Sequence, residues 1–338
     1  MVEHHFVVIG NGPAGNQAAL TLRDMAPDAR ITLISRHQGG CYRPHLLPHF
    51  VAGKIEEEAL FVFSPSSYKD KDIKLRCGQE VVDIRPESRE ITLDHKEVIP
   101  FHGLIIAVGG RPCIPEHLAV FREHMLTLKT LKDARAWIQR LRKVDRVLVI
   151  GGDLTSFAFT KALLDMGKKV YFVFNEDALW PLRFDKTRFE EMAHKLSQKG
   201  VEVLIYSRLK GMSTISDGDI EVQLEDRKIR VGLIGAFFGL APDIRFAGRS
   251  GFRIDRGILV DEYLHTGFEG IYATGDCAQI YHPEIRDYWV SIGHDNAVNL
   301  GRIAAQNLAG EKIQAEVPKE SIFEVQGVKV NTSWWAEF

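Results

Sequence analysis

Short apolar runs alternate with amphipathic stretches from the start of the chain. Phe6–Ile9 has the pattern of a buried strand, Gly15–Met25 that of a helix, and Arg30–Ile34 that of a second strand. Pro27 and Asp28 break the chain between the helix and the second strand. This order predicts a strand–helix–strand unit of a parallel sheet.

The same order returns in the second half of the chain. Val147–Ile150 is predicted as a strand, Phe157–Met166 as a helix and Lys169–Phe174 as a strand. A helix at Phe189–Lys199 and a strand at Val201–Tyr206 continue the alternation. Further predicted elements are helices at Asp133–Leu141 and Asn296–Leu308 and short strands at Val81–Ile84, Glu90–Leu93, Leu104–Val108, Val222–Leu224, Ile229–Val231, Leu233–Phe237, Gly257–Val260 and Gly270–Ala273. The two halves indicate an internal duplication.

This duplication predicts an α/β fold of two Rossmann-like three-layer domains, one inserted in the other. Residues 1–111 and 240–310 would form the first domain, and residues 112–239 would form the inserted one. Residues 311–338 would be a short C-terminal tail.

A first glycine loop, Gly10–Gly15, follows the first predicted strand. Gly10 permits a tight turn, Gly12 lets the backbone approach a pyrophosphate, and Gly15 lets the helix pack close to the strand. Pro13 and Ala14 complete the G-x-G-x-x-G pattern, and the helix N-terminus that they begin attracts phosphate charge. Because the loop lies between an apolar strand and a helix, it predicts a dinucleotide site.

The acid that usually binds the ribose, about 20 residues further on, is missing here. Ser35 and Arg36 occupy its place. Ser35 could hydrogen-bond a ribose, and Arg36 could lie over an adenine face. The alternative is that Arg36 is a solvated charge at the end of a strand.

A second glycine loop, Gly151–Ser156, keeps only the first glycine of the pattern. Gly152 follows it, and Asp153 and Ser156 stand at the other two glycine positions. Asp153 would place a carboxylate where a pyrophosphate should lie, and like charges repel. Asp153 is also a good N-cap for a helix that begins at Leu154, so the protein itself would fill the anion site.

The strand after the second glycine loop also lacks the ribose-binding acid. Phe174 occupies that position and accepts no hydrogen bond. Two hypotheses remain open: this domain binds NAD(P)H in an altered pose, or it is retained for structure alone. If the strand ends later, Glu176 or Asp177 could hold the ribose.

Two more segments carry a resemblance to a known family. Leu104–Pro112 and Gly270–Ala278 are similar to the A-T-G-x-x-P and I-Y-A-x-G-D-x-A signatures of the pyridine nucleotide–disulfide oxidoreductase superfamily. Over about residues 1–310 the chain resembles its rubredoxin, ferredoxin and nitrite reductase-type flavoproteins. The resemblance implies FAD on the first domain and NAD(P)H on the second, and it implies that the C-terminal interface domain is truncated.

The resemblance also implies which residues hold FAD. Asp276 would bind the ribityl chain, and the helix N-terminus near Asn296 and Ala297 would face the flavin pyrimidine and stabilise an anionic reduced ring. The other implied contacts are Arg43, Pro44, Val82, Ala107, Gly109 and Gly275. Gly151, Gly152 and Asp153 are the corresponding candidates for NAD(P).

Composition limits the other function classes. The net charge of −2 offers no basic field for nucleic acid, and no apolar stretch is long enough to cross a membrane. With no cationic leader ahead of Phe6, we expect a cytoplasmic protein. The four cysteines are too widely spaced for structural disulfides or a zinc ribbon. His45 and His49 lack a third ligand, so no metal site is expected.

Cys41 lies where disulfide reductases keep their redox cysteines, but no second cysteine follows at the needed spacing. It is either a reactive thiol, activated by a neighbouring cation, or a buried and inert one.

These features predict an FAD-dependent oxidoreductase that passes electrons between NAD(P)H and a redox protein or partner subunit. The flavin performs the chemistry, so no catalytic side chain is assigned. One alternative is the FAD subunit of a larger redox complex that does not use its degenerate NAD(P) site. Another is a flavin-binding scaffold or redox sensor without turnover.

Overall fold

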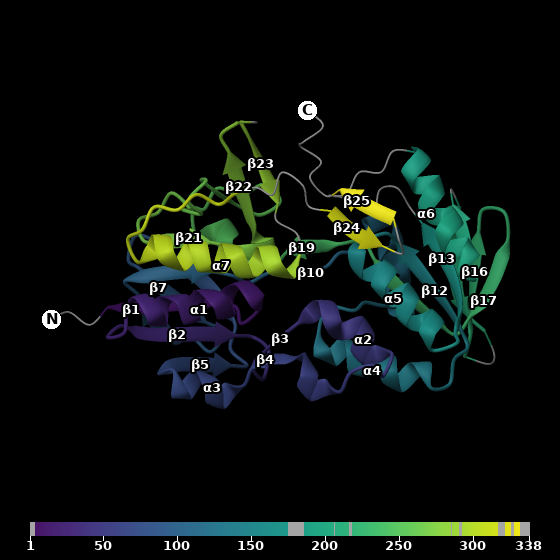
Figure 1. Cartoon of the computed structure of the whole chain (residues 1–338), viewed down its shortest axis with the longest axis horizontal. Coiled ribbons are helices and arrows are strands. Elements are labelled where there is room, and N and C mark those ends of the chain that lie inside the picture. The colour runs from purple at the N-terminus through teal and green to yellow at the C-terminus, as the bar shows by residue number, and fades with distance from the viewer. Residues whose placement is uncertain are drawn as a thin grey trace. The chain divides into compact units, whose positions relative to one another are not determined.

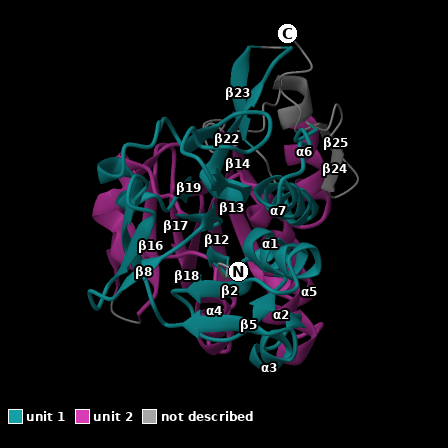
Figure 2. Cartoon of the chain, turned by 90° about the vertical axis from the view of Figure 1, so that its left-hand side faces the viewer, with its two compact units in different colours: residues 1–43, 61–111, 241–317 teal, residues 44–60, 112–240, 318–338 magenta. Residues whose placement is uncertain are grey.

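Two five-stranded sheets form the centre of the computed structural model (Figure 1). The structure describes residues 4–174, 186–205, 207–215, 218–284, 286–290, 293–316, 322–325 and 328–331. The chain forms two compact units (Figure 2). Unit 1 comprises Met1–Arg43, Phe61–Arg111 and Ala241–Val317, and unit 2 comprises Pro44–Leu60, Pro112–Leu240 and Pro318–Phe338.

The sheet of unit 1 consists of β1 (His5–Ile9), β2 (Arg30–Ser35), β5 (Ile73–Cys77), β9 (Gly103–Ile106) and β21 (Ile271–Ala273). Its order is β21-β9-β1-β2-β5, and neighbouring strands are parallel. All five residues of the central strand β1 are buried, as its unbroken apolar run requires. Helices α1 (Pro13–Met25) and α7 (His294–Leu308) pack side by side (Figure 1).

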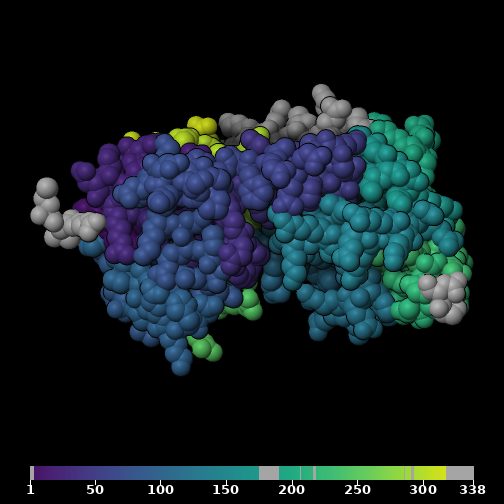
Figure 3. All heavy atoms as spheres, turned by 90° about the horizontal axis from the view of Figure 1, so that it is seen from below, coloured from purple at the N-terminus to yellow at the C-terminus, as the bar shows by residue number. Residues whose placement is uncertain are grey.

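Shorter elements complete unit 1. They are α3 (Pro65–Asp70) and the strands β3 (Cys41–Tyr42), β4 (Phe61–Phe63), β6 (Val81–Arg85), β7 (Glu90–Leu93), β8 (Val98–Pro100), β20 (Ile258–Val260), β22 (Ala278–His282) and β23 (Asp287–Val290). At two of the points where the chain passes from one unit to the other, β10 (Gly110–Pro112) and β19 (Leu240–Pro242) form a two-stranded sheet. In the space-filling view the segments of the chain can be followed by the colour of their residue numbers (Figure 3).

Unit 2 repeats this plan. Its sheet consists of β11 (Met125–Leu126), β12 (Arg146–Gly151), β13 (Lys169–Phe174), β14 (Glu202–Ile205) and β18 (Leu233–Phe237), in the parallel order β11-β18-β12-β13-β14. Its other elements are α2 (Leu47–Val51), α4 (Leu131–Leu141), α5 (Leu154–Asp165), α6 (Lys186–Gln198), β15 (Leu209–Thr214), β16 (Ile220–Leu224), β17 (Lys228–Val231), β24 (Ile322–Val325) and β25 (Val328–Asn331). The predicted α/β class with two Rossmann-like sheets is confirmed.

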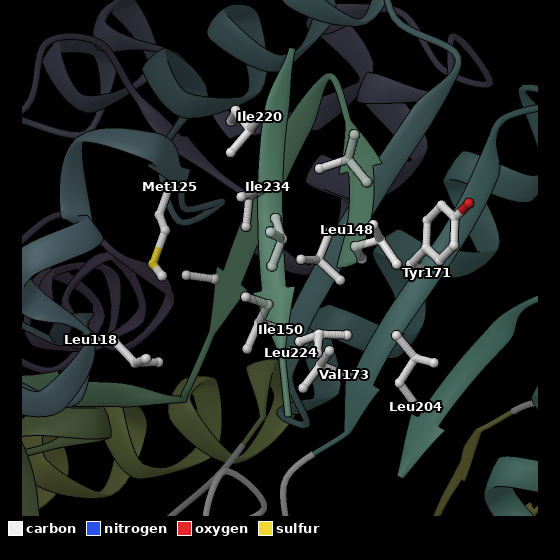
Figure 4. Packing of buried hydrophobic residues seen from close by; sticks show 14 residues of the cluster. Leu118, Met125, Leu148, Ile150, Tyr171, Val173, Leu204, Ile220, Leu224 and Ile234 are labelled. Atoms are coloured by element: carbon white, nitrogen blue, oxygen red, sulfur yellow. The ribbon is translucent and has the colours of Figure 1, made fainter. Parts of the chain in front are cut away.

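Alternating side chains of β13 separate the layers of unit 2. Tyr171 and Val173 join a buried cluster with residues of β16 and β17 on one face of the sheet (Figure 4). Phe172 and Phe174 point to the opposite face, where both rings contact Phe157 of α5. This alternation follows from the two-residue period of a strand. The result is a layer of helix, a parallel sheet and an antiparallel sheet.

Residues 44–60 lie differently from the sequence prediction, which places them in the first domain. They belong to unit 2 because α2 packs against α4 and α5. Glu57 also forms an ion pair with Arg135 of α4, and Lys54 pairs with Asp165 of α5.

Candidate functional site

The first glycine loop brings three segments of unit 1 into close approach. Gly10 has φ +106°, and a Cβ atom there would lie 2.1 Å from the carbonyl oxygen of Ala107 at the end of β9. A Cβ atom on Gly15 would lie 1.8 Å from the carbonyl oxygen of Gly10. Neither position accepts a side chain, so both glycines are required by packing.

Gly12 differs from Gly10 and Gly15, because the space around its Cβ position is open. It is the N-cap of α1, and no side chain caps that helix end. A Cβ atom on Gly12 would meet nothing within 4 Å. Nearby, the buried Nδ2 of Asn11 has no hydrogen-bond partner among the described residues. A helix start whose N-cap offers no side chain, beside open space, fits an anionic group such as a dinucleotide pyrophosphate.

Several other predicted FAD residues lie close to the first glycine loop because small residues pack there. Gly275 has φ +70°, and its Cβ position lies 3.1 Å from the Cβ of Ala14, so the turn that carries the half-buried Asp276 adjoins the start of α1. Ala297, in the first turn of α7 beside Asn296, packs with Ala14 and Ala107. The structure therefore brings together the predicted residues of four separate segments, namely those at 10–15, 107, 275–276 and 296–297.

The end of β2 differs from the simple expectation of a ribose contact. The Ser35 hydroxyl donates to the carbonyl of His37 at 2.9 Å and accepts from its N–H at 3.2 Å. Arg36 forms an ion pair at the end of β2: its Nη1 lies 2.5 Å from Oδ2 of Asp243, and its side chain stays 42% exposed. Burial raises the pKa of Asp243, but the hydrogen bond and charge of Arg36 outweigh burial and leave that pKa below its usual range.

Asp243 was missed by sequence reasoning, although a signal for it exists. Gly239 and Pro242 repeat the spacing of Gly109 and Pro112, and Asp243 follows directly. The two glycines adopt similar turns, with φ +65° at Gly109 and +76° at Gly239. Within unit 1, Asp243 N–H donates to the carbonyl of Gly109, which places the carboxylate at the end of β2.

Three other predicted FAD residues are less closely tied to the loop. Val82, on β6, is 47% exposed. Arg43 lies near His294, the first residue of α7, where burial lowers the histidine pKa and Arg43 lowers it further. Pro44 begins the part of unit 2 that follows Arg43.

The second glycine loop keeps the tight turn of the first. Gly151 has φ +129°, and its Cβ position lies 1.8 Å from the carbonyl oxygen of Phe237. That oxygen accepts hydrogen bonds from the N–H groups of Gly152 and Asp153, at 3.0 and 3.4 Å. These two amides are therefore turned into the protein.

The Asp153 side chain fills the position that is open in the first loop. Its Oδ1 accepts from Ser156 N–H at 2.9 Å and its Oδ2 accepts from Gly239 N–H at 3.0 Å. The predicted N-cap is thereby confirmed. Burial raises the pKa of Asp153, against hydrogen bonds from the backbone of Ser156, Gly239 and Thr155 that lower it. The protein itself occupies the anion-binding groups of this loop.

Phe174 occupies the strand-end position at which a ribose-binding acid is expected. The residue is buried at the end of β13, and its ring lies 5.5 Å from the ring of Phe157. It offers no polar side-chain atom to a sugar. Glu176 and Asp177, the other candidates for a ribose contact, lie outside the described residues.

Cys41 has the environment of an inert thiol. It is 1% exposed, and burial raises its pKa to about 12 against the charge of Arg43. Cys277 is also buried, and burial raises its pKa to about 11. Because the thiolate is the reactive form, neither side chain reacts near neutral pH.

We therefore expect Cys41→Ala to keep the flavin reduction rate within about twofold, because a protonated, buried thiol takes no part in the reaction. Stopped-flow measurement of flavin absorbance would check this, with the thiol content of the unfolded variant as the control for the substitution. A fall in rate of about a hundredfold would assign Cys41 a chemical role.

An open glycine loop between a strand and a helix of a Rossmann-like sheet is typical of a dinucleotide-binding protein. Residues 4–304 match the profile of the family described as "Pyridine nucleotide-disulphide oxidoreductase". The chain belongs to this family, and it is an FAD-dependent oxidoreductase, as predicted. No helix among the described residues is long and apolar enough to span a membrane.

Curated relatives agree with this assignment. The chain is 30% identical over 276 residues to the nitric oxide reductase FlRd-NAD(+) reductase of Klebsiella pneumoniae, covering 81% of this chain and 72% of the relative. The protein of the same name from Citrobacter koseri is 29% identical over 275 residues, with the same shares covered.

Two solved structures are similar in fold. One is the reductase in the covalent putidaredoxin reductase–putidaredoxin complex, with TM-score 0.84, 23% identity, and 96% of this chain and 79% of that chain covered. The other is the NAD-dependent persulfide reductase from A. fulgidus, with TM-score 0.86, 24% identity, and 95% and 62% covered.

Proposed function

We propose that this protein passes electrons between NAD(P)H and a redox protein through FAD bound over the first glycine loop. The observation that carries the proposal is the start of α1 at Gly12, where the N-cap offers no side chain and the space around its Cβ position is open. Gly10 and Gly15, on either side of it, have no room for a side chain. The names of the relatives support it, since they are reductases of flavorubredoxin and putidaredoxin.

In this proposal, residues 1–111 and 240–310 form the FAD domain, apart from residues 44–60, which belong to unit 2. Residues 112–239 form the NAD(P)H-type domain. The backbone at Gly12 and the amides that follow it would hold the pyrophosphate, and Asp276 would hold the ribityl chain. The start of α7 at Asn296 and Ala297 would place the positive end of a helix at the flavin. FAD, when bound, supplies the hydride-accepting ring, and the protein supplies binding, orientation and electrostatics.

A second candidate function is favoured by one observation in unit 2. Asp153 occupies the anion-binding groups of the second glycine loop, which weakens any nucleotide site there. In this case the protein is the FAD subunit of a larger redox complex, and its electrons enter and leave through partner proteins.

Anaerobic titration of the FAD-loaded protein separates the candidates. If the proposal is right, NADH or NADPH bleaches the flavin absorbance, and a redox protein from the same cells restores it. Bleaching by co-purified redox proteins, with none by either nucleotide, would support the complex subunit instead. If only dithionite reduces the flavin, the remaining interpretation is a flavin-binding scaffold or a redox sensor without turnover.

A further inference from the structure

A tyrosine behind the first glycine loop is tied to the loop by its hydroxyl group. Tyr68, on α3, is completely buried, and its ring packs edge-on against Phe63 with ring centroids 4.7 Å apart. Its hydroxyl oxygen lies 2.7 Å from Oδ1 of Asn11 and 2.5 Å from Oδ1 of Asn16. Asn11 stands between Gly10 and Gly12, and Asn16 lies in the first turn of α1.

The number of hydrogen-bond donors limits how the side chains of Tyr68, Asn11 and Asn16 can be oriented. Burial raises the pKa of Tyr68, so the hydroxyl keeps its proton. A hydroxyl donates one hydrogen bond and accepts two, so it donates to only one of the two amide oxygens. The other asparagine must then present its N–H to the hydroxyl oxygen. The backbone of Cys41 lies close enough to this group to lower its pKa, against the larger effect of burial.

Two orientations of the Asn11 amide are possible, and the negative charge of a dinucleotide expected at the first glycine loop favours one of them. If Tyr68 donates to Asn11 Oδ1, the Nδ2 of Asn11 is left over, and this buried atom has no partner among the described residues. If Asn11 were turned round, its carbonyl oxygen would take that unpartnered place instead. A pyrophosphate accepts hydrogen bonds and repels a carbonyl oxygen, so only the first arrangement suits a bound dinucleotide.

We propose that Tyr68 is a positioning residue for FAD: it fixes the Asn11 amide so that the Asn11 N–H is presented to the phosphate side of the cofactor. The inference rests on the proposed FAD site at the first glycine loop. Asn16 then donates to the Tyr68 hydroxyl and anchors it to α1.

The test is a double-mutant cycle on FAD affinity, measured by quenching of flavin fluorescence as FAD is added to the apoprotein. Tyr68→Phe and Asn11→Ala should each weaken FAD binding roughly tenfold, the value of one hydrogen bond to a charged group. The double variant should be no weaker than Asn11→Ala alone, because Tyr68 acts through Asn11. Tyr272→Phe is the matched control: it removes a hydroxyl that donates to the carbonyl of Asn307, and it should leave FAD affinity unchanged.

Two results would overturn the inference. One is unchanged FAD affinity in Tyr68→Phe. The other is a loss in Tyr68→Phe that persists in the Asn11→Ala background and vanishes in Asn16→Ala, which would give the hydroxyl a structural role in α1 only. Thermal unfolding of each apoprotein tells loss of fold from loss of affinity. A wild-type protein that binds no FAD would overturn the proposed function together with this inference.

Discussion

Replacing Gly12 by Asp is expected to abolish FAD retention. The substitution gives the first glycine loop the carboxylate that already closes the second one at Asp153. At Gly12 a side chain has room, since nothing lies within 4 Å of its Cβ position, and the backbone φ of −83° suits any residue. The new carboxylate would cap α1 and repel the pyrophosphate, so we expect FAD affinity to fall by more than about a hundredfold.

The ratio of flavin to protein absorbance after purification measures this effect. Gly12→Ala is the matched control, because it adds a Cβ atom without a charge, and it should keep most of its FAD. Thermal unfolding of Gly12→Asp should match that of the wild-type apoprotein or exceed it, because the aspartate supplies the missing cap. Full flavin content in a folded Gly12→Asp protein would place the FAD elsewhere.

The reverse change, Asp153→Gly, is expected to open the second glycine loop to a pyridine nucleotide. Removing the carboxylate takes away the side-chain acceptor that the N–H groups of Ser156 and Gly239 now engage. It also removes a like charge from the place where the pyrophosphate would lie. We expect flavin reduction by NADH or NADPH at low concentration to become at least about tenfold faster, as observed by stopped flow.

Asp153→Asn is the control for the charge alone. Its side-chain oxygen can still accept from the Ser156 N–H, so the loop stays capped while the repulsion disappears. The reduction rate of this variant should lie between those of the wild type and Asp153→Gly. If both variants reduce no faster than the wild type, the cap at Asp153 does not limit access of the nucleotide.

Much of the fold could be predicted from patterns within short segments of the sequence. The difference between the two glycine loops could be predicted in the same way. β1, α1 and β2 could be predicted because an apolar strand, a glycine turn and an amphipathic helix are all encoded within a few residues. Asp153 could be predicted as a cap because an N-cap bonds to amides of its own helix.

The features that sequence reasoning missed depend on residues far apart in the chain. Arg36 and Asp243 are separated by 207 positions, and the repeated Gly-x-x-Pro spacing before Asp243 does not indicate Arg36 as its partner. Tyr68 meets Asn11 across 57 positions, and its place in α3 shows no sign of the contact. Likewise, residues 44–60 follow directly on β3 of unit 1, but the packing of α2 with α4 and α5 assigns them to unit 2.

The most direct test of the account compares NAD⁺ binding to the FAD-loaded wild-type protein and to Asp153→Gly by calorimetric titration. NAD⁺ leaves the flavin oxidised, so the titration reports binding alone. If Asp153 closes the second glycine loop while the first holds FAD, the variant binds NAD⁺ at least about tenfold more tightly at unchanged flavin content. Equal affinities in the two proteins would contradict the account.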